Sequence, residues 1–103
     1  MVSYRMWVPN RRGRADLHFN APEIKKISVV HITVSEATAL DSVHLLGGQT
    51  FVPNFGAASI TLQNVSVRDG GVDFYVFVDW STPLNLVTDI TIMDPPAQIV
   101  IGS

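Results

Sequence analysis

The sequence predicts an all-β protein: a small immunoglobulin-like antiparallel β-sandwich that forms a single domain over residues 1–103. Three observations lead to this prediction. Short segments alternate apolar and polar residues with the period of a strand, and turn signals recur about every eight to twelve residues. Only one stretch, residues 36–46, is compatible with a helix. Two packed sheets fit this pattern, although a chain without cysteine lacks the Cys–Trp–Cys pattern of true immunoglobulin domains.

Two strands are predicted in the first third of the chain. Residues 2–8 alternate between Ser3, Arg5 and Trp7 and an apolar set, which is Val2, Tyr4, Met6 and Val8. Pro9-Asn10 should end this strand, and the arginine-rich segment up to Asp16 is predicted to be a loop. Residues 27–35 are rich in β-branched side chains and predict a second strand. Its two faces are Val30, Ile32, Val34 and Val29, His31, Thr33.

Residues 36–46 allow two interpretations. Ser35 can cap a helix, apolar residues recur every third position, and Gly47-Gly48 can end the helix. Equally, residues 42–46 can form a strand that runs into a glycine turn. We favour a short helix or helical turn near residues 36–41. The segment 50–56 is expected to be a loop or an edge strand that carries Phe51 and Phe55.

Asp69-Gly70 is the strongest turn signal in the chain. It predicts a β-hairpin with a type I′ turn, which requires positive φ at both central residues. This register places Val67 opposite Val72 and Val65 opposite Phe74. The apolar residues further back, Ile60 and Leu62, have the opposite parity, so we predict a β-bulge near Gln63-Asn64.

A second hairpin is predicted between residues 72–80 and 84–92, with its loop at residues 81–85. It would place Trp80 opposite Leu86, Phe77 beside Asp89, and Asp79 about 7 Å diagonally from Asp89. The residues expected to be most buried are Trp80, Phe74, Val76, Val78, Leu62, Leu86, Ile90 and Ile92. Asp94-Pro95-Pro96 should end the hairpin, and residues 98–101 are expected to form a short terminal strand.

The composition favours contact between subunits. Hydrophobic residues make up 47% of the chain and charged residues only 16%, so a homo-oligomer is expected. The net charge of −2 is unevenly distributed. Residues 1–26 hold six of the seven basic side chains and two acidic ones, and the remainder of the chain holds one basic and seven acidic side chains. Such halves can steer a charged partner or attract each other, and in a homo-oligomer we expect them to meet across a subunit boundary.

Several classes of function lack their sequence signals. There is no cysteine, no phosphate-binding loop, no G-x-S-x-G motif, and no ligand spacing among the three histidines, so no metal or cofactor is expected. No apolar run spans a membrane, and no export signal is recognised, so the cytoplasm is the default expectation. Arg11, Arg12 and Arg14 can grip phosphates, but a pI near 5.8 argues against nucleic acid.

One strand face carries the candidate site. Asp73, Tyr75, Phe77 and Asp79 share a face that is acidic at both ends and aromatic in the middle. With Asp89, Trp7 and the three arginines, these residues form the predicted binding or interface set. The face can be a subunit interface, a platform on which sugar rings stack, or a second buried face covered by residues 50–56.

The function expected from the sequence is therefore not catalytic. We expect a β-sandwich that acts through its surface, as a self-associating structural or protein-interaction module. The alternative is a carbohydrate-binding module in which the aromatic residues stack on a glycan and the aspartates bind its hydroxyl groups. A third alternative is a small enzyme with a His/Asp pocket.

Overall fold

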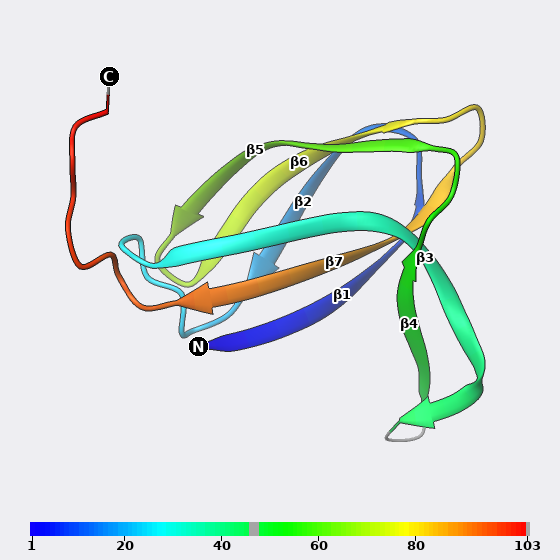
Figure 1. Cartoon of the computed structure of the whole chain (residues 1–103), viewed down its shortest axis with the longest axis horizontal. Helices are drawn as coiled ribbons and strands as arrows, with labels where there is room; N and C mark the ends of the chain where they lie inside the picture. Colours follow the sequence, from blue (N-terminus) through cyan, green and yellow to red (C-terminus); the bar gives the residue numbers. More distant parts are fainter. Residues whose placement is uncertain (46–47, 103) are drawn as a thin grey trace.

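The computed structural model describes residues 1–45 and 48–102, and these contain seven strands and no helix (Figure 1). The strands are β1 (Val2–Arg11), β2 (Gly13–Asn20), β3 (Val29–Leu45), β4 (Gly48–Asn54), β5 (Ser59–Arg68), β6 (Gly71–Asp79) and β7 (Leu84–Met93). No helix in the described part of the chain is long and apolar enough to cross a membrane. The prediction of an all-β protein is confirmed.

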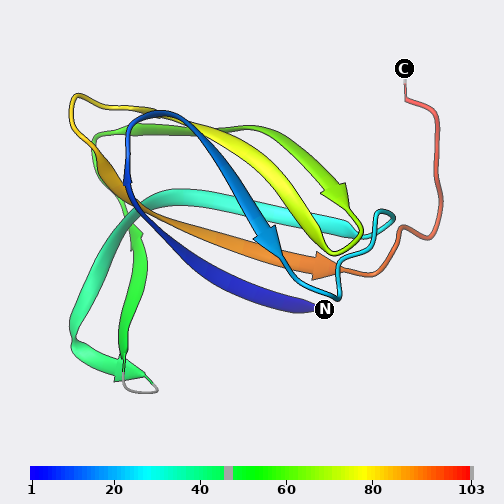
Figure 2. The same ribbon diagram turned by 180° about the vertical axis from the view of Figure 1, so that it is seen from behind.

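The strands form two antiparallel sheets. Sheet A has the order β1-β7-β3-β4, and sheet B has the order β2-β6-β5. Seen from behind, β1 and β2 diverge from one bend into the two sheets (Figure 2). The two sheets agree with a β-sandwich, but this order does not confirm the immunoglobulin-like type, in which the first strand pairs with the second.

The predicted first strand is confirmed, but the predicted arginine loop is wrong. Pro9 lacks an N–H, and Asn10, with φ of 60°, donates its backbone N–H to the Asn85 side chain, so the pairing with β7 shifts here and resumes at Arg11. Gly13, with φ of 69°, then starts β2 in the other sheet. Within β2, alternation of Ala15, Leu17 and Phe19 with polar residues was a strand signal that the arginine content obscured.

The predicted helix near residues 36–46 is also wrong. β3 continues without interruption to Leu45, because Glu36 to Leu40 pair with residues of β4. Leu46 and Gly47 lie outside the described residues. β4 is the edge strand that was one of the two expectations for residues 50–56. Pairing with neighbouring strands has therefore overridden a local spacing that suits a helix.

The β5–β6 hairpin has the predicted register. Val67 pairs with Val72, Val65 with Phe74 and Leu62 with Val76, and the register shifts between Leu62 and Asn64, where the bulge was expected. The turn is not type I′, however. Gly70 has φ of 85°, but among the described residues Asn10 is the only non-glycine with positive φ.

The β2–β3 connection explains this turn. Gly70 donates its N–H to the carbonyl oxygen of Ile24 at 2.7 Å, and its own carbonyl accepts from the Ala21 N–H at 3.0 Å. The Asp69 carboxylate accepts from the Lys26 N–H at 2.8 Å. These bonds hold the turn from outside the hairpin, so its geometry is decided by a segment far away in the sequence.

The second predicted hairpin is wrong. β6 lies at the centre of sheet B and β7 at the centre of sheet A, so residues 80–83 carry the chain from one sheet to the other. None of the cross-strand pairs predicted between β6 and β7 exists, and Asp79 and Asp89 lie in different sheets. Trp80, which was expected in the core, is 40% exposed because it follows the end of β6.

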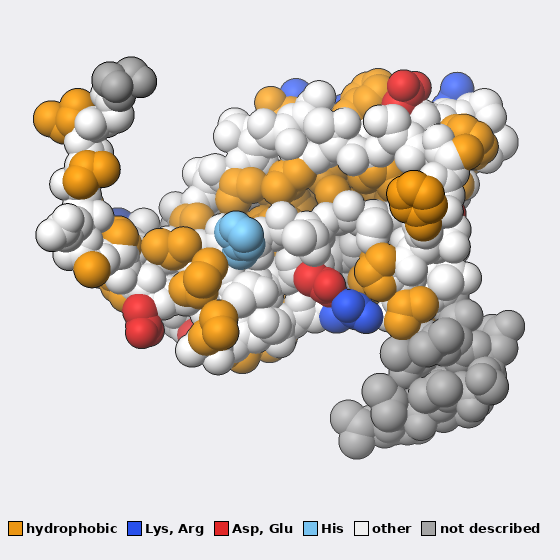
Figure 3. Space-filling model, in the orientation of Figure 1, with side chains coloured by type: hydrophobic (Ala, Val, Ile, Leu, Met, Phe, Trp, Pro, Cys, Tyr) orange, Lys and Arg blue, Asp and Glu red, His pale blue; other side chains and the backbone are white. Residues whose placement is uncertain are grey.

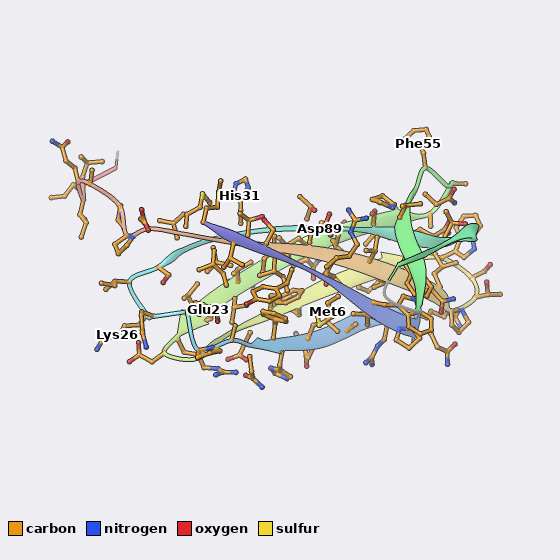
Figure 4. The ribbon with its side chains drawn as sticks, turned by 90° about the horizontal axis from the view of Figure 1, so that it is seen from below. Met6, Glu23, Lys26, His31, Phe55 and Asp89 are labelled. Carbon is orange, nitrogen blue, oxygen red and sulfur yellow. The ribbon has the colours of Figure 1, made fainter. Side chains whose placement is uncertain are left out.

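The core fills the space between the sheets. Sheet B contributes Ala15, Leu17, Val72, Phe74, Val76 and Val78, and sheet A contributes Val8, Leu86, Ile90 and Ile92. Phe74, Val76, Val78, Leu86, Ile90 and Ile92 were all predicted to be buried, and these predictions are confirmed; Leu62 is only partly buried. Figure 4 shows Met6 on the inner side of β1, whereas His31 and Asp89 lie on the outer side of sheet A.

After Met93 the described chain forms no further strand, so the strand predicted at residues 98–101 is not present. Instead this segment runs clear of both sheets (Figure 1).

Candidate functional site

The outer face of sheet B carries the predicted mixed face. Asp73, Tyr75, Phe77 and Asp79 alternate with the core residues of β6, and they point away from sheet A. Phe77 is 40% exposed. Residues 50–56 belong mainly to β4 in sheet A, so the expectation that they cover this face is wrong. The face is open.

A hydrogen-bonded network fills one end of this face. Asp73 accepts from His18 Nδ1 at 2.8 Å and from Arg68 Nε at 3.0 Å, and Arg68 also donates to the Asn20 side chain at 2.7 Å. The bonds from Arg68, first, and from His18 hold the pKa of the Asp73 carboxyl below its usual range. The charge of Asp73 is therefore paired within the chain.

Arg14 covers the aromatic centre of the face. Its guanidinium carbon lies 3.9 Å from the centre of the Tyr75 ring, a cation–π contact, and its Nε donates to Asp16 at 2.9 Å. A flat ligand can stack on Tyr75 only if it displaces this guanidinium. Phe77 is the more accessible ring.

A shallow hollow of about 250 Å³ lies on this face, lined by Asp16, His18, Asn64, Ser66, Asp73, Phe74 and Tyr75. It contains a serine, a histidine and an aspartate, the residue types of a hydrolytic triad, but their arrangement in space does not suit one. His18 and Ser66 pair with Asp73 from opposite sides, so they lie two strand spacings, or about 10 Å, apart. A triad needs the histidine between the serine and the carboxylate. The arrangement therefore gives no route for proton transfer from Ser66 to His18.

Trp7 and Asp89, which were predicted to join this set, lie on the outer face of sheet A instead. Asp89 accepts from Arg5 Nε at 2.7 Å and from Arg5 Nη2 at 2.9 Å, and Arg5 Nη1 donates to the Phe51 carbonyl. Trp7 stacks on Phe51. Val87 lies in the same row as Trp7 and is only 2% exposed although it is on the outer face.

Arg11 and Arg12 lie at the bend between β1 and β2. The predicted set is thus divided among three places: Arg14 joins the mixed face of sheet B, Trp7 and Asp89 lie on sheet A, and the other two arginines lie at the bend. One sugar site cannot use Trp7 together with Tyr75 and Phe77, because they lie on opposite outer faces. Among the side chains that the structure describes, those of residues 1–38 and 51–102, no three His, Cys, Asp or Glu are grouped so as to hold a metal ion.

The structure also contains an apolar surface that was not predicted. Where β5 forms the edge of sheet B, its inward side chains face those of β3 across an open side of the sandwich. We call this surface the β3–β5 seam; it consists of Val30, Ile32, Val34, Ile60, Leu62, Val65 and Val67, all only partly buried. Figure 3 shows a row of hydrophobic side chains along this side, between β5 and β3.

The opposite side of the sandwich is more closed. Ala15 and Leu17 of β2 are buried, the rings of Tyr4 and Phe19 pack with centroids 5.0 Å apart, and the Tyr4 hydroxyl donates to Glu23. Periodicity separated the two faces of β3, and it identified the inward residues of β5 correctly. It could not show that β5 is an edge strand, which is why these residues stay partly exposed.

Among the side chains that the structure describes, the most exposed aliphatic residues lie near the end of the chain. Ile99 is 92% exposed, Val100 is 78% exposed and Ile101 is 100% exposed. We call residues 98–101 the C-terminal arm.

Comparison with known proteins gives no further guide to function. No protein-family model matches this chain, and no curated protein or solved structure matches it.

Proposed function

We propose that this chain is a non-catalytic β-sandwich module that acts by self-association, with the β3–β5 seam as its contact surface. The observation that carries this proposal is the seam itself: seven partly exposed aliphatic side chains from β3 and from the edge strand β5 line one open side of the sandwich. Contiguous apolar surface of this kind usually marks an interface in a small domain.

The sequence of β5 supports the same proposal. Edge strands of monomeric proteins are normally protected by charge or proline, but residues 59–67 contain neither. By contrast, β2 at the other edge of sheet B presents Arg14, Asp16 and His18. Of the two edges of this sheet, β5 is the one suited to receive another strand.

The outer face of sheet B, which was the interface expected from the sequence, is a weaker candidate. Asp73 is paired with Arg68 and His18, and Arg14 is paired with Asp16 and covers Tyr75. The basic N-terminal segment was expected to meet the acidic remainder across a subunit boundary. Arg5 and Asp89 make such a pair within the chain.

Light scattering of chromatographed protein at rising concentration tests this proposal. We expect Leu62→Thr with Val65→Thr to shift the protein toward the monomer while circular dichroism shows that it stays folded. The matched control is Tyr75→Ser with Phe77→Ser on the outer face, which should associate like wild type. If only the control variant becomes monomeric, the interface is the outer face of sheet B instead.

Carbohydrate binding is the second candidate. The hollow on sheet B brings the polar side chains of Asp16, His18, Asn64, Ser66 and Asp73 beside Tyr75, which is a chemistry suited to sugar hydroxyl groups. A glycan array with the wild-type chain tests this reading. Binding that is lost on Asp73→Asn and retained in the seam variant would favour it.

A further inference from the structure

We infer that the C-terminal arm of one copy inserts into the β3–β5 seam of a second copy and adds a strand beside β5. This inference rests on the proposed self-association and names the segment that makes the contact. An extended segment that pairs with a sheet edge gains main-chain hydrogen bonds, and its alternate side chains fill the pockets below.

The arm has the chemistry that the seam requires. Its three apolar residues, Ile99, Val100 and Ile101, are all β-branched, which favours a strand, and all are exposed in the isolated chain. Because strand side chains alternate, Ile99 and Ile101 point to one side and Val100 to the other. Inserted beside β5, the two isoleucines would lie over the seam, and Val100 would join the outer face.

The position of the arm suits exchange between copies. Asp94-Pro95-Pro96 follows β7 directly, and proline cannot continue the sheet pairing. The chain then leaves the sandwich, so that the arm stands away from its own body (Figure 1). Four residues extend over about 13 Å, so the arm covers less than half of the ten residues of β5.

The other edge strands are less suitable acceptors. β1 is interrupted at Pro9-Asn10, and β4 contains Pro53, which cannot donate a ladder hydrogen bond. β2 carries charged side chains, and its inward Ala15 and Leu17 are already buried. Among the four edges, β5 combines a run without charge or proline, residues 59–67, with an open apolar row.

Association of arm variants tests the inference. Ile99→Asp with Ile101→Asp should weaken self-association by about tenfold or more, because burial of one isoleucine already corresponds to that factor. Val100→Asp is the matched control and should weaken it much less, since Val100 faces solvent in the inserted arm. If the two variants weaken self-association equally, the arm does not insert with Ile99 and Ile101 over the seam and Val100 toward solvent.

Cross-linking locates the contact. The natural chain has no cysteine, so each variant carries one thiol. A Val100→Cys chain mixed with a tagged Ser66→Cys or Thr61→Cys chain should form a mixed disulfide under mild oxidation. A tagged Asp16→Cys chain on β2 should not. Cross-linking to β2 as readily as to β5 would overturn the arm–β5 contact.

The two proposals fail differently. If wild type associates and the double arm variant associates equally, the arm is not the inserted strand, and self-association stands. If wild type is monomeric at high concentration, self-association itself is wrong, and the arm exchange falls with it.

Discussion

The ring of Trp7 stacks on the ring of Phe51, with centroids 4.7 Å apart and planes 7° apart, although β1 and β4 are the two outermost strands of the same sheet. Sheet A must therefore curl into a half-barrel, so that its edges approach each other over the outer face. Val87 is buried beneath this contact, and Arg5 links Asp89 to the Phe51 carbonyl. This second, smaller cluster holds β4 against the rest of sheet A.

Replacing Phe51 by alanine should therefore loosen this curl. We expect a loss of about 1–2 kcal/mol of stability, because the ring is partly buried and the aromatic pair adds to its burial. In a Trp80→Phe background, Trp7 is the only tryptophan, and its fluorescence should shift to the red. Unchanged emission in the Phe51→Ala protein would show that the stacking does not exist in solution.

The two phenylalanines of β6 should respond differently to truncation. Phe74 is 4% exposed in the core, so Phe74→Ala should cost roughly 3–5 kcal/mol. Phe77 lies on the outer face of the same strand, and Phe77→Ala should cost about 1 kcal/mol or less. Urea denaturation measures both. A larger cost at Phe77 would mean that the faces of β6 are reversed.

The turn between β5 and β6 depends on Gly70. A β-branched residue resists its φ of 85°, so Gly70→Val should cost about 1 kcal/mol or more, even though a Cβ there would meet no atom within 4 Å. Gly70→Asn is the control and should cost less, because asparagine tolerates this conformation. Thermal unfolding compares the two, and equal stabilities would contradict the assigned turn.

The carboxyl group of Asp73 should titrate below the ordinary aspartate pKa. Arg68→Ala should raise this pKa more than His18→Ala does, because the hydrogen bond from Arg68 is the larger cause. A lowered pKa in the folded state means that Asp73 stabilises the fold above the unfolded pKa, about 3.9. This contribution is lost as the pH falls through the lower folded value. Carbon-detected NMR measures the titration, and a larger effect of His18→Ala would refute the ranking.

Turn residues and the alternation of apolar and polar residues predicted the hairpin register, the bulge and the strand faces, because these features depend on residues close together in the sequence. Asp69-Gly70 fixed the β5–β6 register, and the parity change between Leu62 and Val65 located the bulge. The inward faces of β1 and β6 followed from alternation alone.

Long-range pairing decided the rest, and the sequence carries no direct signal for it. A loop such as residues 81–83 looks the same whether it closes a hairpin or crosses between sheets, so β6 and β7 were wrongly paired. For the same reason Asp79 and Asp89 were placed together, and Trp80 was placed in the core. The mixed face of β6 was predicted correctly as a face. Its contacts with Arg14 and His18 were missed because the segment up to Asp16 had been predicted to be a loop and no strand had been predicted at His18.

Hydrogen exchange of β5 at low and high protein concentration tests the central claim most directly. In a monomer, the amides on the open edge of β5 are exposed, and β2, at the other edge of the same sheet, provides an internal reference. If the seam is the self-association surface, protection of β5 should rise with concentration while that of β2 stays constant. Protection of β5 that does not change with concentration, in protein that light scattering shows to be associated, would contradict the account.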